Sequence, residues 1–410
     1  MPLNDSERRL ASYIDRLHDR LIEDLRLHVG LPTGGDNRSA LDETRSLLCA
    51  RLAKLGAEVS MVPPGPRPSW LHDAPIEAEG PPTAVCSRVR GKAGPRILLS
   101  GHLDTVHDPS PSSTFRSLVI NADGKCATGP GCVDMKGGLV IAVAALEALE
   151  ACGLSPAWSF ILNSDEETGS YWSEAALRAE ARRHDIGLVV EPALPDGSLV
   201  TERPGSGQFM IEVRGRSAHV GRDFTSGVSA VTRLGEILIE LSRLPDPLRG
   251  KILSVGPIEG GPATNVVPDR ARAWGNVRFR DTSIATELEH QLLAFATDPG
   301  AMPAVIVRTS LNRPAKPATP DVMKLAEKAA AVAADLEQRL PFGRTGGVCD
   351  GNILQDEGLP VIDTLGVRGG GLHTPQEWID LTSLVDRCKL LAILIARLAD
   401  AGPNSFTPRS

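Results

Sequence analysis

The segment ILLSGHLDTV, residues 97–106, begins with an apolar run and continues into a histidine and an aspartate. Because the run is short and a glycine follows it, it indicates a strand buried on both faces. Residues 158–162 and 186–190 repeat this pattern, and helical patterns at 137–149 and 174–183 alternate with these strands. The alternation predicts a mainly parallel mixed sheet flanked by helices, which is an α/β fold.

A different pattern interrupts this alternation between residues 203 and 313. Its strands and helices follow the order β-α-β-β-α-β, which is typical of a ferredoxin-like unit and suits insertion into a host domain. We therefore predict a discontinuous host domain, residues 1–203 and 313–410, and an inserted domain at 204–312. The expected strands are 208–214, 251–255, 271–280, 304–308 and 360–365, and the further helices 6–28, 39–55, 228–244, 284–295, 321–340 and 384–398.

Composition and charge exclude several classes of protein. With 41% hydrophobic and 23% charged residues, the 410-residue chain is neither disordered nor membrane-spanning in composition. The net charge of −7 opposes binding to nucleic acid or to an anionic membrane. The polar N-terminus lacks the features of a secretory signal, which predicts a cytoplasmic protein. Seven scattered cysteines without a CxxC pair predict reduced thiols rather than disulfides or a thiolate zinc site.

Five side chains of the kinds that bind metals follow predicted strands or precede a predicted helix. They are His102, Asp134, Glu167, Glu191 and His373. Each alone could be a helix cap or a hydrogen-bonded loop residue. Together, however, two imidazoles and three carboxylates suit Zn²⁺, with Co²⁺ or Mn²⁺ as substitutes. Because ligands bind beyond the carboxyl ends of parallel strands, we expect these side chains to converge there.

The motifs around these residues resemble a known family, the co-catalytic zinc amidohydrolases that include glutamate carboxypeptidase, acetylornithine deacetylase, succinyl-diaminopimelate desuccinylase and aminoacylase-1. Residues 346–380 are most similar to the glutamate carboxypeptidase branch. The shared motifs, in chain order, are HLDTV at 102–106, VDMKGG at 133–138, DEETGS at 165–170, EP at 191–192, GRSAH at 215–219 and LHTP at 372–375.

The resemblance implies a di-zinc hydrolase, with the inserted domain acting as a lid and dimerisation domain. Asp134 would bridge two Zn²⁺ ions, His102 and Glu191 would complete one site, and Glu167 and His373 the other. Asp104 would orient the His102 ring. The resemblance also implies a cis peptide bond after Asp134.

Catalysis requires a base beside the metals. Neighbouring side chains point in different directions as the chain leaves a strand, so Glu166 can face the attacking water while Glu167 binds metal. The resemblance further implies that His219 stabilises the oxyanion in the partner subunit's site, and therefore a homodimer. Because His219 lies on the inserted domain, we expect the lid to close during turnover.

Three residues are candidates for binding substrate. Arg278 matches the family's carboxylate-binding arginine, although an ordinary sheet-surface charge is an equally good interpretation. Asn265 matches a substrate-contacting asparagine or is a turn residue. Arg313, just after the inserted domain, is a weaker candidate for the same carboxylate as Arg278.

These residues predict a hydrolase that cleaves an amide bond in a small N-acylated amino acid or dipeptide-like substrate with a free carboxylate. Alternatives are an N-acyl amino-acid deacylase of the acetylornithine type, a metal-binding relative without activity, and a cysteine hydrolase using Cys349 and His373. Cys349 and Gly351 depart from the family's usual hydroxyl residue and alanine beside Asp350, which leaves the substrate's side chain open.

Overall fold

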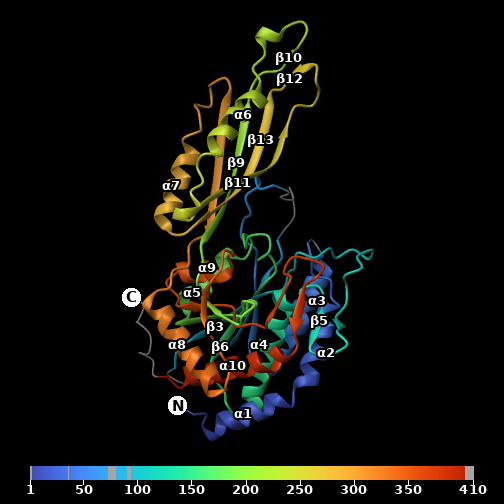
Figure 1. Ribbon diagram of the computed structural model, residues 1–410, viewed down its shortest axis with the longest axis vertical. Coiled ribbons are helices and arrows are strands. Elements are labelled where there is room, and N and C mark those ends of the chain that lie inside the picture. The colour runs from blue at the N-terminus through green and yellow to red at the C-terminus, as the bar shows by residue number, and fades with distance from the viewer. Residues whose placement is uncertain (1, 36, 73–79, 90–93, 402–410) are drawn as a thin grey trace.

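The computed structural model describes residues 2–35, 37–72, 80–89 and 94–401. Figure 1 shows a broad lower unit, in which helices surround a sheet, and a narrow upper unit built on a second sheet. The chain enters the upper unit near Arg203 and leaves it near Lys316. These two residues pair through backbone hydrogen bonds of 2.9 and 3.0 Å, so the two connections run side by side.

The sheet of the lower unit has six strands in the order β1-β2-β6-β3-β7-β16. Strands β6, β3, β7 and β16 are parallel, whereas β1 and β2 form an antiparallel edge. The parallel strands are buried along their length because helices cover both faces. The bounds are β1 (Glu58–Val62), β2 (Thr83–Arg88), β3 (Ile97–His102), β6 (Trp158–Asn163), β7 (Ile186–Val189) and β16 (Val361–Ile362).

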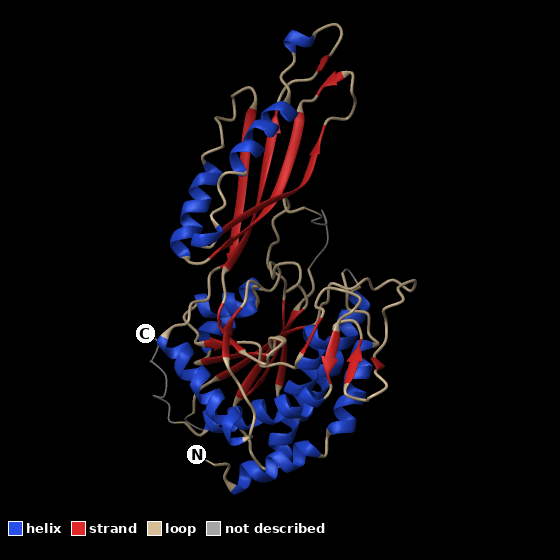
Figure 2. Cartoon of the chain, viewed as in Figure 1, coloured by secondary structure: helices blue, strands red, loops and turns tan. Residues whose placement is uncertain are grey.

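Helices pack on both faces of this sheet, as Figure 2 shows, and the predicted α/β class is confirmed. The larger core lies under α1 (Asp5–Asp15), α2 (His18–Val29), α3 (Arg38–Lys54), α4 (Gly137–Ala151), α8 (Pro320–Asp335) and α10 (Thr382–Ala399). The smaller core, on the opposite face, lies under α5 (Glu174–Arg183) and α9 (Asp350–Asp356).

Several predicted elements differ in length. The helix expected over residues 6–28 is two helices, α1 and α2, separated by a turn at Arg16 and Leu17. A straight helix of that length would span about 35 Å, too far to follow the curved core that both halves contact. Helix α8 ends at Asp335 rather than near 340, and β16 is short because Thr364 has a φ of 61°, which ends the extended conformation. Strands β1 and β2 were not expected.

The upper unit is a four-stranded antiparallel sheet in the order β11-β13-β9-β14, with α6 and α7 on one face (Figure 1). This order and the succession β-α-β-β-α-β are those of a ferredoxin-like unit. The unit has its own core. Its elements are β9 (Gly205–Arg214), α6 (Ala230–Leu241), β11 (Lys251–Gly260), β13 (Arg270–Phe279), α7 (Thr282–Leu293) and β14 (Ala304–Arg313), with β10 (Ala218–His219) and β12 (Val266–Val267) at the tip.

Short elements complete the described chain. They are β4 (Val119–Ile120), β5 (Cys126–Thr128), β8 (Leu199–Glu202), β15 (Phe342–Arg344), β17 (Gly369–Gly370) and β18 (Trp378–Asp380), with helical turns η1 (Cys132–Lys136), η2 (Phe224–Ser226) and η3 (Pro247–Arg249). All seven cysteines are free thiols. Among the described residues, no helix is both long enough and apolar enough to cross a membrane.

Candidate metal centre and active site

The carboxyl ends of β3, β6 and β7 meet at one edge of the sheet and carry ligand-type side chains. His102 is the last residue of β3, the acidic segment 165–167 follows β6, and Glu191 follows β7. Parallel pairing of β3 with both neighbours brings these ends together. The site therefore lies in the crevice where α/β sheets bind ligands.

Asp134 reaches this edge from the turn before α4. Gly131 makes the turn with a φ of 70°, a left-handed conformation that favours glycine. At the start of α4, a Cβ on Gly138 would lie 2.0 Å from the carbonyl oxygen of Val190, so the helix packs directly against the end of β7. The Asp134–Met135 peptide is cis, as the resemblance implied.

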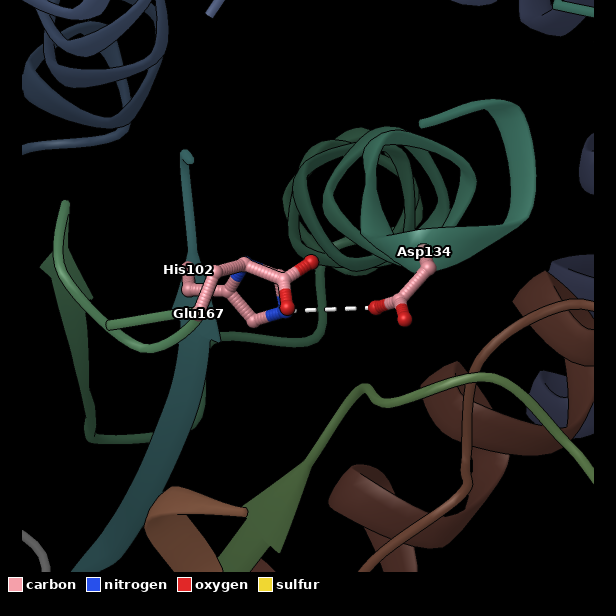
Figure 3. A group of neighbouring side chains, drawn as sticks. All are labelled: His102, Asp134 and Glu167. Atoms are coloured by element: carbon pink, nitrogen blue, oxygen red, sulfur yellow. Dashed lines mark ion pairs between the residues drawn. The ribbon is translucent and has the colours of Figure 1, made fainter. Parts of the chain in front are cut away.

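The five predicted ligands form two triplets that share Asp134. The Nε2 atom of His102 lies 3.3 Å from Asp134 Oδ1 and 3.8 Å from Glu191 Oε1. The Nε2 atom of His373 lies 3.5 Å from Asp134 Oδ2 and 3.3 Å from Glu167 Oε2. Each oxygen of Asp134 therefore faces a different imidazole. Figure 3 shows His102 and Glu167 opposite Asp134, with the His102–Asp134 ion pair dashed.

This spacing fits divalent cations. Ligands at Zn²⁺ bond lengths of about 2.0–2.2 Å and tetrahedral angles lie about 3.3–3.6 Å from one another. Ligand atoms of His102, Asp134 and Glu167 all lie within 4.8 Å of one another. Within the described chain, the buried oxygens Asp134 Oδ1 and Glu167 Oε1 accept no hydrogen bond. Buried acceptors of this kind require a partner, which a cation would supply.

The electrostatics of the cluster also favour positive charge. The carboxylates of Asp134 and Glu167, which accept hydrogen bonds from the His373 ring, raise the pKa of His373 to about 10. Burial alone would lower the pKa of His102, but the carboxylates of Asp104 and Asp134 outweigh it and raise the pKa. The carboxylates that stabilise a protonated ring would equally stabilise a bound cation.

Asp104 contacts both the imidazole of His102 and the acidic segment 165–167. The Nδ1 atom of His102 lies 2.9 Å from the Asp104 backbone carbonyl and 3.5 Å from its carboxylate. The Asp104 carboxylate accepts hydrogen bonds from the backbone N–H groups of Glu166 and Glu167, at 3.2 and 2.9 Å. An Nδ1–H donated to the carbonyl leaves Nε2 free to bind metal.

Glu166 lies beside the two triplets without belonging to either. Its Oε1 atom forms an ion pair of 2.9 Å with Nη2 of Arg313, which also donates to Ser170 Oγ at 2.7 Å. Burial raises the pKa of Glu166 to about 8, while the Arg313 charge acts in the opposite direction. Arg313, a candidate substrate ligand from the sequence, thus pairs with Glu166 in this structure.

A cavity of about 480 Å³ opens over these residues. Arg278 on β13 and Arg313 on β14 reach it because both pair with Ser206 on β9, the strand that lies between them. Arg278 donates to Ser206 Oγ and Asn276 Oδ1, and within the described chain it forms no ion pair with a carboxylate. The lining includes Asp134, Glu166, Glu167, Glu191, Arg203, Arg278, Arg313 and His373 and the apolar Leu194, Pro195, Val348 and Leu372.

His219 and Asn265 lie away from this cavity, at the tip of the upper unit (Figure 1). His219 is exposed on β10, and its Nδ1 accepts a hydrogen bond of 3.1 Å from the Gly221 N–H. Asn265 is also exposed, and its carbonyl accepts from the Val220 N–H at 3.0 Å. Within one chain, His219 and Asn265 do not meet the predicted metal ligands.

Cys349 is not suited to be a nucleophile. Its thiol is buried, its Sγ accepts from the Gly351 N–H at 3.3 Å, and burial raises its pKa. A nucleophilic cysteine needs the opposite, a lowered pKa and access to substrate. The structure therefore gives no support to the cysteine-hydrolase alternative.

Sequence reasoning missed two buried residues beside the site. Arg203 forms a bidentate ion pair with Asp363 at 3.0 and 2.8 Å and donates to the Gly347 carbonyl in the cavity wall. Glu377 accepts hydrogen bonds from the turn that carries Asp134. For Glu377 the signal was its position four residues after His373; Arg203 follows a strand with no comparable signal.

Comparison with known proteins gives consistent matches. The sequence model described as "Peptidase family M20/M25/M40" matches residues 98–397. Carboxypeptidase G2 of Pseudomonas sp. (strain RS-16) is 27% identical over 322 residues, covering 77% of this chain and 76% of that protein. Succinyl-diaminopimelate desuccinylase of Methylobacterium sp. (strain 4-46) is 31% identical over 339 residues, covering 76% and 81%.

Solved structures share the fold. A tripeptidase from Staphylococcus aureus superposes with a TM-score of 0.74 at 21% identity, covering 94% of this chain and 99% of that one. Human carnosine dipeptidase 1 superposes with a TM-score of 0.68 at 19% identity, covering 96% and 100%.

Proposed function

The chain belongs to peptidase family M20/M25/M40 and is a hydrolase of amide bonds, and from this we infer its substrates. We propose that it cleaves N-acylated amino acids or dipeptide-like substrates with a free carboxylate, and that it does so at a di-zinc centre. The observation that carries the proposal is the pair of imidazole–carboxylate triplets sharing Asp134, in the same cavity as Glu166 and Arg278. A base and a guanidinium that forms no ion pair with a carboxylate of the described residues, both beside the predicted metal ligands, suit hydrolysis of an anionic substrate.

His102, Asp134 and Glu191 would hold one cation, and Asp134, Glu167 and His373 the other. Bound Zn²⁺, or Co²⁺ or Mn²⁺ in its place, supplies Lewis acidity that polarises the scissile carbonyl and makes water acidic near neutral pH.

The chain's own residues would handle the proton and the substrate. Glu166 takes the proton of the attacking water and passes it to the leaving amine. Arg278 grips the substrate carboxylate through its planar fork, and the apolar part of the cavity, which includes Leu194 and Leu372, accommodates the acyl group.

We further propose that two chains form a homodimer in which His219 of one chain stabilises the oxyanion in the other chain's site. The position of His219 at the exposed tip, away from its own chain's cavity, supports this arrangement. Asn265, at the same tip, would contact substrate in the same way. The inserted domain would then act as the lid.

A second candidate is an amino-acid deacylase, which the 31% identity to a desuccinylase favours equally. Both reactions use the same centre, and the pocket for the acyl group separates them. The test compares kcat/KM for N-aroyl-glutamates with that for N-acetyl and N-succinyl amino acids in the presence of Zn²⁺, before and after chelation. Carboxypeptidase activity predicts preference for the aroyl substrates. Activity that resists complete removal of metal would overturn the di-zinc proposal.

A further inference from the structure

Glu377 is a fully buried carboxylate whose two oxygens are both occupied by the turn that carries Asp134. Its Oε2 accepts a hydrogen bond of 2.8 Å from the Gly131 N–H. Its Oε1 accepts from the N–H groups of Val133 at 2.8 Å and of Asp134 itself at 3.0 Å. The Glu377 side chain therefore binds the backbone of Asp134, which both triplets share, and of Gly131 and Val133 just before it.

The same carboxylate connects this turn to two other ligand-bearing segments. The Nε2 atom of His107, five residues after His102, lies 2.5 Å from Glu377 Oε2. Glu377 also follows His373 by four residues, and its carbonyl accepts from the Gly129 N–H at 3.2 Å. The three segments that supply His102, Asp134 and His373 thus meet at Glu377.

The chemistry of the turn explains why a charged acceptor lies there. Gly131, Val133 and Asp134 are buried, and a buried backbone N–H without an acceptor is costly. A carboxylate accepts several such hydrogen bonds at once and binds each more strongly than a neutral oxygen.

We propose that Glu377 is a positioning residue for the metal centre, which sets where the Asp134 carboxylate stands relative to the two imidazoles. This inference rests on the di-zinc site proposed above. Asp134 must present one oxygen to each triplet, at 3.3 Å from His102 and 3.5 Å from His373, so displacement of its backbone would disturb both cation sites together. Residues that orient ligands in this way typically contribute 10- to 100-fold to metal affinity.

A purely stabilising role is the alternative, and a matched substitution separates the two. Glu212 is also a buried glutamate that accepts from arginines, including Arg270 at 3.0 Å and Arg272 at 3.2 Å, but it lies in the upper unit. Glu377→Gln and Glu212→Gln each remove one buried charge from the full-length chain. Only Glu377 faces the turn that carries Asp134.

The experiment titrates the metal-free proteins with Co²⁺, follows the visible spectrum, and measures Zn²⁺ affinity by competition with a chromophoric chelator. We expect Glu377→Gln to bind both cations about 10- to 100-fold more weakly, with an altered Co²⁺ spectrum, and Glu212→Gln to match the wild type. Wild-type affinity and spectrum in Glu377→Gln would overturn the inference.

Two further outcomes are informative. If Glu377→Gln does not fold, as judged by circular dichroism, Glu377→Asp keeps the charge and shortens the side chain; weaker binding supports the inference, and wild-type binding overturns it. If the wild-type protein itself binds no cation, the proposed metal centre fails and this inference fails with it. Loss of affinity confined to the Glu377 variants supports both.

Discussion

Replacing Glu166 with glutamine tests the proposed base without removing a metal ligand. The substitution is nearly isosteric, and an amide oxygen can still face Arg313 Nη2, which now forms an ion pair of 2.9 Å with Glu166 Oε1. Glu166 belongs to neither imidazole–carboxylate triplet. Metal content and stability should therefore change little, while the side chain loses its ability to take a proton.

The size of the effect follows from that loss. A positioned general base contributes about 10²- to 10⁴-fold to kcat. This range corresponds to about 2.7–5.4 kcal/mol in the activation free energy. KM should stay close to the wild-type value, because Arg278 and the apolar wall of the cavity are untouched.

The assay pairs metal analysis with steady-state kinetics, and Glu167→Gln serves as the neighbouring control. Glu167 Oε2 lies 3.3 Å from His373, so its substitution should lower the number of bound cations, which Glu166→Gln should not. If Glu166→Gln retained two cations per chain and hydrolysed substrate at the wild-type rate, the assignment of the base would be refuted.

Four other predictions follow. Arg278→Ala should lower kcat/KM about 10- to 150-fold by losing a charged hydrogen bond worth about 1.5–3 kcal/mol. The control is Arg280→Ala, at an exposed arginine just after β13, which should leave the kinetics unchanged; equal effects would argue against carboxylate binding by Arg278. Asp363→Asn should lower the unfolding free energy by about 3–5 kcal/mol in urea titrations at neutral pH, since it leaves buried cations unpaired. In the wild type, Arg203 and Lys316 lower the pKa of Asp363 by more than burial raises it. The contribution of this carboxylate to the unfolding free energy is therefore complete above about pH 4 and is lost as the pH falls through the folded-state pKa. Mixing inactive His219→Ala chains with inactive Glu166→Gln chains should restore about a quarter of wild-type activity if the dimer forms as proposed. Half of the dimers are then hybrids, and each hybrid has one intact site. No recovery after subunit exchange would argue against the action of His219 in trans. Chelation should abolish activity and lower the melting temperature, and Zn²⁺ should reverse both effects.

The fold class could be predicted from the sequence because its signals are local. Short apolar runs such as 97–100 and 158–162, each ending at polar or glycine residues, indicate buried strands, and the order β-α-β-β-α-β predicts the ferredoxin-like unit. Element ends were less certain: the turn at Arg16 and Leu17 and the early end of β16 depend on how the chain follows the core.

The sequence alone also predicted which ligand-type side chains come together, since His102, Asp134 and His373 lie at strand or helix ends and within distinctive motifs. Only the tertiary structure decided which atoms face each other. The two oxygens of Asp134 point to different imidazoles, Arg313 contacts Glu166 across 147 residues, and Glu377 binds the Asp134 backbone across 243. Such contacts depend on how distant segments pack against one another. A local pattern of polar and apolar residues therefore does not predict which buried donor meets which acceptor.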